Sequence, residues 1–136
     1  MNEKELFNFV RELGYEDLTT AVDPYSVWDC YSKNSNIYVE LKCRRTHYDK
    51  LLIEESKFDR LVKAAADKGM VPVYICSTPK GIWAFNLAGA ELAWVDQEMP
   101  ATTDFTDTRT KLKSVSYLDI SEGMQLAYSS SSEKSV

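Results

Sequence analysis

The sequence has few of the residues that build disulfide, zinc or histidine-dependent sites. It contains one histidine, His47, and three cysteines with no CxxC pair. A disulfide framework and a zinc site are therefore not expected, and neither is a hydrolase or nuclease that uses a histidine base. The chain also has no Walker A sequence and no GxGxxG motif, which are the usual signatures of nucleotide and dinucleotide binding.

Glycine, proline and long apolar runs are scarce as well. Five glycines and four prolines in 136 residues exclude collagen-like and linker-dominated chains. No stretch approaches the roughly 18–20 apolar residues of a membrane span, and the first residues lack the layout of a signal peptide. The hydrophobic residues, 44% of the chain, suffice for the core of one domain. We therefore expect a cytoplasmic protein with no membrane partner, a single domain over residues 1–128 and a disordered tail over 129–136.

Charge is unevenly distributed along this acidic chain, whose net charge is −5. Residues 1–32 carry more acidic than basic side chains, residues 33–63 carry more basic ones, and residues 64–136 are acidic again. A locally basic middle suits a confined anion-binding surface beside carboxylates rather than a protein that coats nucleic acid. A solvated helix face explains the same pattern equally well.

Hydrophobic periodicity predicts an α/β domain. Helices are expected over residues 2–13 and 54–68, and each is followed by a glycine at the place for a C-terminal cap. Strands are expected over 25–31, 37–43, 70–76, 81–87, 91–95 and 115–120, with the first two as one hairpin and 81–87 with 91–95 as another. A helical crossover makes the 70–76 strand parallel to its predecessor, within a mixed sheet flanked by helices.

Three acidic side chains stand where their neighbours make a carboxylate unusual. Glu3 lies within the apolar arc of the first helix, and Asp29 lies in an otherwise hydrophobic strand. Glu40 shares a strand face with Lys42, because side chains alternate along a strand. Pairing of the first two strands brings Asp29 near Glu40, and two converging carboxylates need a cation between them. Lys42 and Mg²⁺ are the candidates, and an exposed sheet face with a Glu–Lys pair is the plain alternative.

The order of these features resembles the PD-(D/E)XK nuclease superfamily and, within it, the archaeal-type Holliday junction resolvases. The resemblance covers residues 3–95. EKELFNFVRELGY is similar to the first helix with its glutamate, WDCY supplies the aspartate, and YVELKCRR supplies the ExK element. The stretch KLLIEESKFDRLVKAAADKGMVPVYIC is similar to the helix and strand that follow. Two departures are Trp28, which stands where the motif has proline, and residues 96–136, which do not match.

The resemblance implies a restriction-endonuclease-like core of order αβββαβ and a Mg²⁺-dependent endonuclease that hydrolyses DNA, with Mn²⁺ able to replace Mg²⁺. Oxygen ligands for the metal would come from Asp29, Glu40 and the main-chain carbonyl of Leu41, with Glu3 acting through a water. Lys42 would position or polarise the attacking water. Basic side chains that follow this strand are candidates for binding DNA phosphates: Arg44, Arg45, Lys50, Lys57 and Arg60.

Three readings of the function remain open at this point. Branched DNA is one candidate substrate, and a resolvase of this size is expected to form a homodimer so that two sites cut two strands. A nuclease of the same fold that nicks or trims linear or single-stranded DNA is the second reading. The third is a catalytically silent nuclease fold that serves as a nucleic-acid-binding or assembly module. The compact size also suits a phage protein that acts on DNA recombination or repair in the host cytoplasm.

Overall fold

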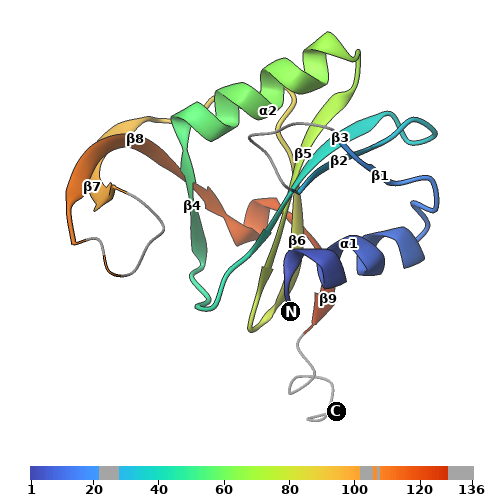
Figure 1. Cartoon of the computed structure of the whole chain (residues 1–136), viewed down its shortest axis with the longest axis horizontal. Helices are drawn as coiled ribbons and strands as arrows, with labels where there is room; N and C mark the ends of the chain where they lie inside the picture. Colours follow the sequence, from blue (N-terminus) through green and yellow to red (C-terminus); the bar gives the residue numbers. More distant parts are fainter. Residues whose placement is uncertain (22–27, 102–105, 107, 129–136) are drawn as a thin grey trace.

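A computed structural model of the chain describes residues 1–21, 28–101, 106 and 108–128. Figure 1 shows how the helices and sheets of these residues are arranged. In chain order the elements are α1 (Glu3–Glu12), β1 (Thr19–Thr20), β2 (Asp29–Ser32), β3 (Ile37–Cys43), β4 (Lys50–Glu54), α2 (Glu55–Asp67), β5 (Val71–Thr78), β6 (Gly81–Asn86), β7 (Val95–Pro100), β8 (Thr110–Asp119), the short 3₁₀ helix η1 (Ile120–Glu122) and β9 (Met124–Tyr128). None of the described helices is both long enough and apolar enough to cross a bilayer.

In the described part of the chain, the central sheet has six strands in the order β1-β2-β3-β5-β6-β9, and only its β3–β5 pair is parallel. On one face, Leu6 and Val10 of α1 pack with Val39 of β3. On the other face, Leu61 of α2 packs with Tyr38, the strand neighbour of Val39. Alternation along β3 thus gives each helix its own core. The α/β class and the mixed central sheet flanked by helices are confirmed.

The first helix forms as its sequence predicts. The side chain of Asn2 accepts a hydrogen bond from the main chain of Glu5 at 2.9 Å, and the Glu5 side chain accepts one from the main chain of Asn2 at 3.1 Å. This capping box satisfies two main-chain donors that a helix start leaves open. After the C-cap at Leu13, Gly14 takes a φ of +128°, where a side chain would be strained.

The hairpin and crossover predictions hold for the described residues. β2 and β3 pair antiparallel, although residues 25–27 of the expected first strand lie outside the described part of the chain. Asn36 has a φ of +57° in the connecting turn, a conformation that asparagine tolerates better than most residues. After α2, β5 returns parallel to β3, with Ile37 opposite Val71. The expected tail, residues 129–136, also lies outside the described residues.

The predicted hairpin of 81–87 with 91–95 is wrong. β6 pairs with β9 instead, and residues 91–94 form no strand. Leu92 and Trp94 are large apolar residues spaced two apart, as on one face of a strand, but they pack on the core beneath α2. The Trp94 ring lies 5.4 Å from that of Phe58. An alternating pattern indicates that one side of a segment is buried, and a loop that packs on the core can show this pattern as well as a strand.

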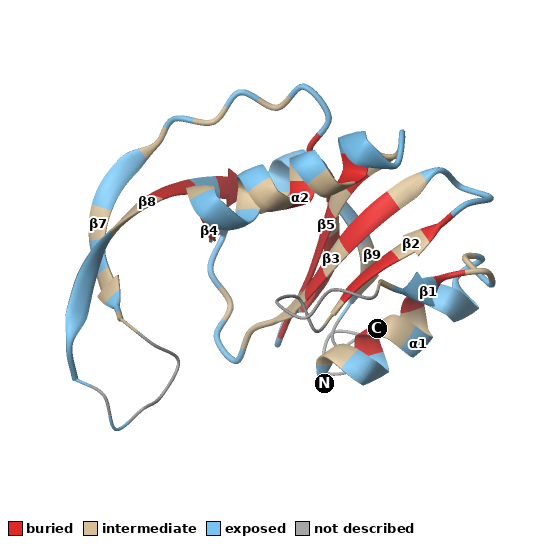
Figure 2. Ribbon diagram, turned by 45° about the horizontal axis from the view of Figure 1, so that its top comes forward, coloured by how far each residue is buried: buried red, intermediate tan, exposed pale blue. Residues whose placement is uncertain are grey.

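A second sheet of three strands, in the order β4-β8-β7, was not predicted. β4 lies directly before α2, and β8 begins five residues before the expected strand at 115–120. Figure 2 shows β7 and the outer half of β8 extending away from the central sheet with mostly exposed residues. This outer half has no apolar side to mark it as a strand, so its hydrogen-bonded pairing leaves no periodic signal in the sequence.

Candidate active site

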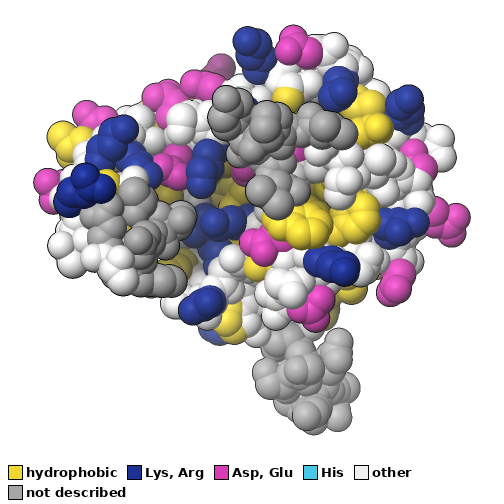
Figure 3. Space-filling model, viewed as in Figure 1, with side chains coloured by type: hydrophobic (Ala, Val, Ile, Leu, Met, Phe, Trp, Pro, Cys, Tyr) yellow, Lys and Arg dark blue, Asp and Glu magenta, His cyan; other side chains and the backbone are white. Residues whose placement is uncertain are grey.

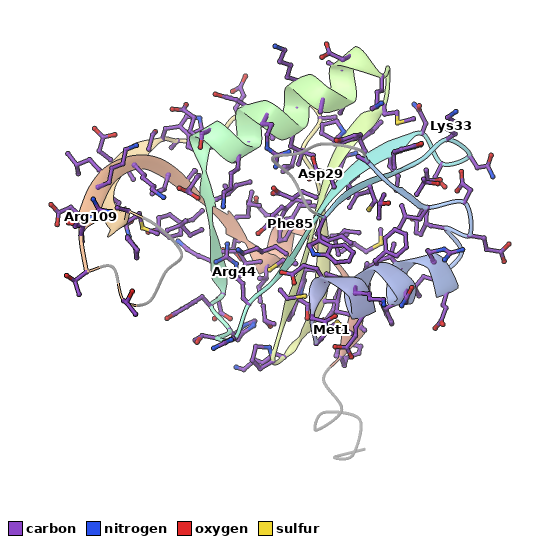
Figure 4. All side chains as sticks on the ribbon, in the orientation of Figure 1. Met1, Asp29, Lys33, Arg44, Phe85 and Arg109 are labelled. Carbon is purple, nitrogen blue, oxygen red and sulfur yellow. The ribbon has the colours of Figure 1, made fainter. Side chains whose placement is uncertain are left out.

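The hairpin of β2 and β3 places two carboxylates side by side. Asp29 and Glu40 are direct partners in the antiparallel register, so their side chains share the face that α2 covers. The Asp29 side chain is fully buried, and the Glu40 side chain is 14% exposed. Asp29 lies under α2 in Figure 4. We call these two residues the carboxylate pair, and the structure brings them together as the hairpin predicts.

The cation between the two carboxylates is Arg60 of α2. Its Nη1 donates to Oδ2 of Asp29 at 2.6 Å, and its Nη2 donates to Oε1 of Glu40 at 2.7 Å. The Tyr38 hydroxyl donates to the same Asp29 oxygen at 3.1 Å. Lys42 was a candidate for this position and does not take it, because it forms no ion pair among the described residues. A bidentate guanidinium matches two separate acceptors better than an ammonium does.

Burial raises the pKa of Glu40, and the nearby charge of Asp29 raises it further. Arg60 opposes this shift most strongly, followed by Lys57 and then Lys42. The three cations therefore offset only part of the cost of burying the charged form of Glu40, and its pKa stays raised. Additional positive charge near Glu40 would lower its pKa and stabilise its charged form.

The two oxygens of the Asp29 carboxylate have different surroundings. Oδ1 is buried and accepts no hydrogen bond from the described residues. A buried acceptor without a donor is rare in folded proteins. An unpartnered carboxylate oxygen next to a second carboxylate is a donor set that suits a hard cation such as Mg²⁺. The carboxylate pair thus offers oxygens of the kind that the expected Mg²⁺ binds, although no group of three or more His, Cys, Asp or Glu side chains among the described residues is arranged to hold a metal.

Lys42 lies two residues after Glu40 on the same face of β3, as the alternation predicts. It is partly buried and has no hydrogen bond or ion pair among the described residues. Its charge contributes to the electrostatics of Glu40. The ammonium is therefore near the carboxylate pair and uncommitted to another protein group.

Glu3 is not assembled with the other acidic residues. It faces the core side of α1, as predicted, and its Oε1 accepts a hydrogen bond from the main-chain nitrogen of Cys43 at 3.3 Å. α1 covers the face opposite to the carboxylate pair, so Glu3 reaches the sheet at the end of β3 instead. Leu41 likewise directs its buried side chain to the α1 face. Roles for Glu3 and the Leu41 carbonyl at a metal stay predictions.

The five basic candidates for phosphate binding have different surroundings. Arg44 donates through Nη2 to the main-chain carbonyl of Leu52 and, at 3.4 Å, to the Tyr74 hydroxyl, so it links the end of β3 to β4 and β5. Arg45 and Lys50 are exposed. Arg44 lies apart from Asp29 in Figure 4. Arg44 and Arg60 are therefore engaged inside the protein, whereas Arg45 and Lys50 are accessible to a ligand.

A second charged cluster lies at the start of α2 and was not predicted. Glu54 forms ion pairs with Lys57, the fourth of the basic candidates, at 3.2 Å and with Lys113 of β8 at 3.0 Å. Figure 3 shows Lys and Arg side chains beside Asp and Glu in the middle of this face, between β4 and β3. Sequence reasoning missed the contribution of Lys113 because nothing indicated that β8 lies beside β4.

Comparison with solved structures finds a nuclease fold. The structure of Hjc, a Holliday junction resolvase from the archaeal hyperthermophile Archaeoglobus fulgidus, is similar over 92% of this chain and 93% of that chain, with a TM-score of 0.54 and 14% sequence identity. This chain shares the fold of that resolvase. The similarity extends beyond residues 3–95, to which the sequence resemblance is limited. No family model matches the sequence, and no curated protein does.

Proposed function

We propose that the protein is a Mg²⁺-dependent endonuclease that hydrolyses phosphodiester bonds of branched DNA. One observation carries the proposal: the carboxylate pair of Asp29 and Glu40 has an unpartnered buried oxygen, and the uncommitted Lys42 lies on the same face. Similarity to the fold of a Holliday junction resolvase supports the same chemistry and favours branched DNA over other substrates.

Asp29 and Glu40, with the main-chain carbonyl of Leu41, would hold the metal ion. Bound there, Mg²⁺ would supply positive charge to the reacting phosphate and water. The Tyr38 hydroxyl donates to one oxygen of Asp29 at 3.1 Å, and the other oxygen, Oδ1, would be available to help hold the metal ion. The protein thus prepares the orientation of its most buried ligand before substrate arrives.

Lys42 would act on the reacting phosphate. Water attacks phosphorus, the bond to the 3′ oxygen breaks, and the products are a 3′-hydroxyl and a 5′-phosphate. Negative charge grows on the phosphate oxygens along this path, and an ammonium at Lys42 stabilises it. Exposed Arg45 and Lys50 would bind phosphates away from the cut, and binding there falls as salt rises. In a homodimer, two such sites would cut two strands.

A silent nucleic-acid-binding or assembly module is the second candidate function, and one observation favours it. Converging acids would be hard to explain in a protein without a metal, but Arg60 gives both of them a counter-ion. The carboxylate pair and Arg60 are thus compatible with a purely structural role.

The decisive experiment offers labelled four-way junction, linear duplex, single-stranded DNA and RNA to the full chain with Mg²⁺, Mn²⁺ or EDTA. We expect cleavage of the junction that depends on metal, and at least about a 100-fold loss in Asp29→Asn. Asp59→Asn, an exposed aspartate on α2 beside Arg60, is the matched control and should cut normally. Binding of DNA without cleavage under every condition would favour the silent module, and equal cutting by Asp29→Asn would reject the site.

A further inference from the structure

Arg60 holds the position between the two carboxylates that a bridging cation would take. Its guanidinium contacts Asp29 at 2.6 Å and Glu40 at 2.7 Å, so a single side chain serves both acids. These are charge-assisted hydrogen bonds in a setting with little water, because the Asp29 side chain is fully buried. Arginine also keeps its charge at any pH that a protein tolerates. The counter-ion of the carboxylate pair is therefore a side chain whose charge does not depend on pH.

We infer that Arg60 is a displaceable counter-ion, which a divalent cation has to move before it can bind the carboxylate pair. Two cations cannot share the same oxygen atoms without strong repulsion at such short distances. The inference rests on the proposed function, because it takes Asp29 and Glu40 as the metal ligands. It adds that, in the free protein, Arg60 excludes divalent cations that would bind the carboxylate pair only weakly.

The two oxygens of Asp29 differ in a way that makes the exchange feasible. Oδ2 accepts hydrogen bonds from both Arg60 and Tyr38, whereas Oδ1 is buried and has no partner among the described residues. A divalent cation therefore competes with Arg60 for Glu40 and for Oδ2, but it gains Oδ1 without competition. The Arg60 side chain is 29% exposed, so its guanidinium has a path towards solvent when it leaves.

A different role for Arg60 makes the opposite prediction. If Arg60 instead holds the two carboxylates in the orientation that a metal needs, its removal weakens metal binding. If it competes, its removal strengthens metal binding. The sign of the change in metal affinity therefore separates a displaceable counter-ion from a positioning residue.

The test titrates the full-length protein, without DNA, with Mg²⁺ and with Ca²⁺ in a calorimeter at pH 8. We expect Arg60→Met to bind either ion roughly tenfold more tightly than the wild type, which is the size expected for the loss of a charge-assisted contact. Lys63→Met is the control, because Lys63 is an exposed cation three residues further along α2. Its affinity should stay within about twofold of the wild type. Equal or weaker binding by Arg60→Met would overturn the inference.

Two further measurements keep the test valid if Arg60→Met folds poorly. Arg60→Lys retains the charge but cannot bridge two acceptors with a planar fork, so its affinity should lie between those of the wild type and Arg60→Met. In the wild type, the side-chain NMR signal of Arg60 should shift as Ca²⁺ saturates the protein, while that of exposed Arg45 should not. An Arg60 signal that stays unchanged at saturation rejects displacement. If no protein binds either ion, both the proposed function and this inference fail, whereas equal affinities reject the inference alone.

Discussion

The two charged clusters beside α2 have opposite imbalances. In the first, which we call the acid-rich cluster, two acids, Asp29 and Glu40, share the cation of Arg60. In the second, the cation-rich cluster, two cations, Lys57 and Lys113, share the acid of Glu54. The surplus acid is buried, whereas the surplus cations are 49% and 27% exposed. A buried surplus of negative charge calls for a further cation, and an exposed surplus of positive charge attracts anions.

In the proposed nuclease, the two imbalances would serve different parts of phosphodiester hydrolysis. A metal ion needs anionic ligands that are shielded from water, and the DNA backbone needs cations that it can reach. α2 carries residues of both clusters, Arg60 in the first and Lys57 in the second, and its N-cap residue is Glu54. The comparison therefore predicts that changes in the acid-rich cluster affect turnover or metal binding, whereas changes in the cation-rich cluster have small effects on stability.

Loss of the Lys42 ammonium should give a large effect on turnover. Because charge on the phosphate grows only towards the transition state, we expect Lys42→Ala to lower kcat by roughly 100-fold or more. DNA affinity in Ca²⁺ should change little, since one phosphate contact is a small share of the salt-dependent binding. Lys42→Arg should not restore the rate, because a planar guanidinium does not replace a compact ammonium. Single-turnover rates and binding isotherms measure the two quantities separately.

A loss of DNA affinity without a loss of turnover would show that Lys42 takes no part in catalysis beside the carboxylate pair. If Lys42→Ala binds DNA several-fold more weakly yet cuts at the wild-type rate once saturated, Lys42 is a phosphate contact. It would then belong with exposed Arg45 and Lys50, and the surplus of acid beside it would have no catalytic partner on β3.

Glu40→Gln should show that the acid-rich cluster is strained without metal. The pKa of Glu40 is raised, so the folded state binds more protons than the unfolded state just above the usual value of 4.5. Stability that depends on this group therefore falls as pH rises through that window. We expect Glu40→Gln in EDTA to gain on the wild type by about 1 kcal/mol between pH 4.5 and pH 8. Urea unfolding at several pH values measures the difference, and a difference that is constant with pH would contradict the strain.

The carboxylate pair could be predicted because it depends on local rules. A turn between two short strands fixes the register, and the register sets Asp29 opposite Glu40. The helix at α1 followed from its spacing and its capping residues in the same way. These features involve residues close together in the chain, so pattern and propensity suffice to place them.

The counter-ion and the second sheet depend on contacts that are distant in the sequence. Arg60 flanks the buried stripe of α2, and a long side chain there can reach the sheet or extend into solvent. Only the packing angle of α2 decides between these outcomes. Similarly, β4 pairs with β8 across more than fifty residues, and the outer half of β8 has no apolar alternation. The residues of the cation-rich cluster can be read from the sequence, but the contact between β4 and β8 that brings them together cannot.

The cation-rich cluster should give the smallest effect, and with the opposite dependence on pH. Burial alone would raise the pKa of Glu54, but hydrogen bonds from Lys113 and Lys57 outweigh it and hold the pKa below its usual value. Its stabilisation is therefore present above about pH 4.5 and is lost as pH falls through the lowered pKa. We expect Glu54→Gln to cost about 0.5–1 kcal/mol at pH 7, less at pH 3, and less in 1 M salt, because these cations are partly exposed. Urea unfolding checks each condition, with the exposed Glu91→Gln as a control that should stay near the wild type. A cost that persists at pH 3 would mean that Glu54 acts through packing rather than charge, and the contrast between the two clusters would then be one of burial alone.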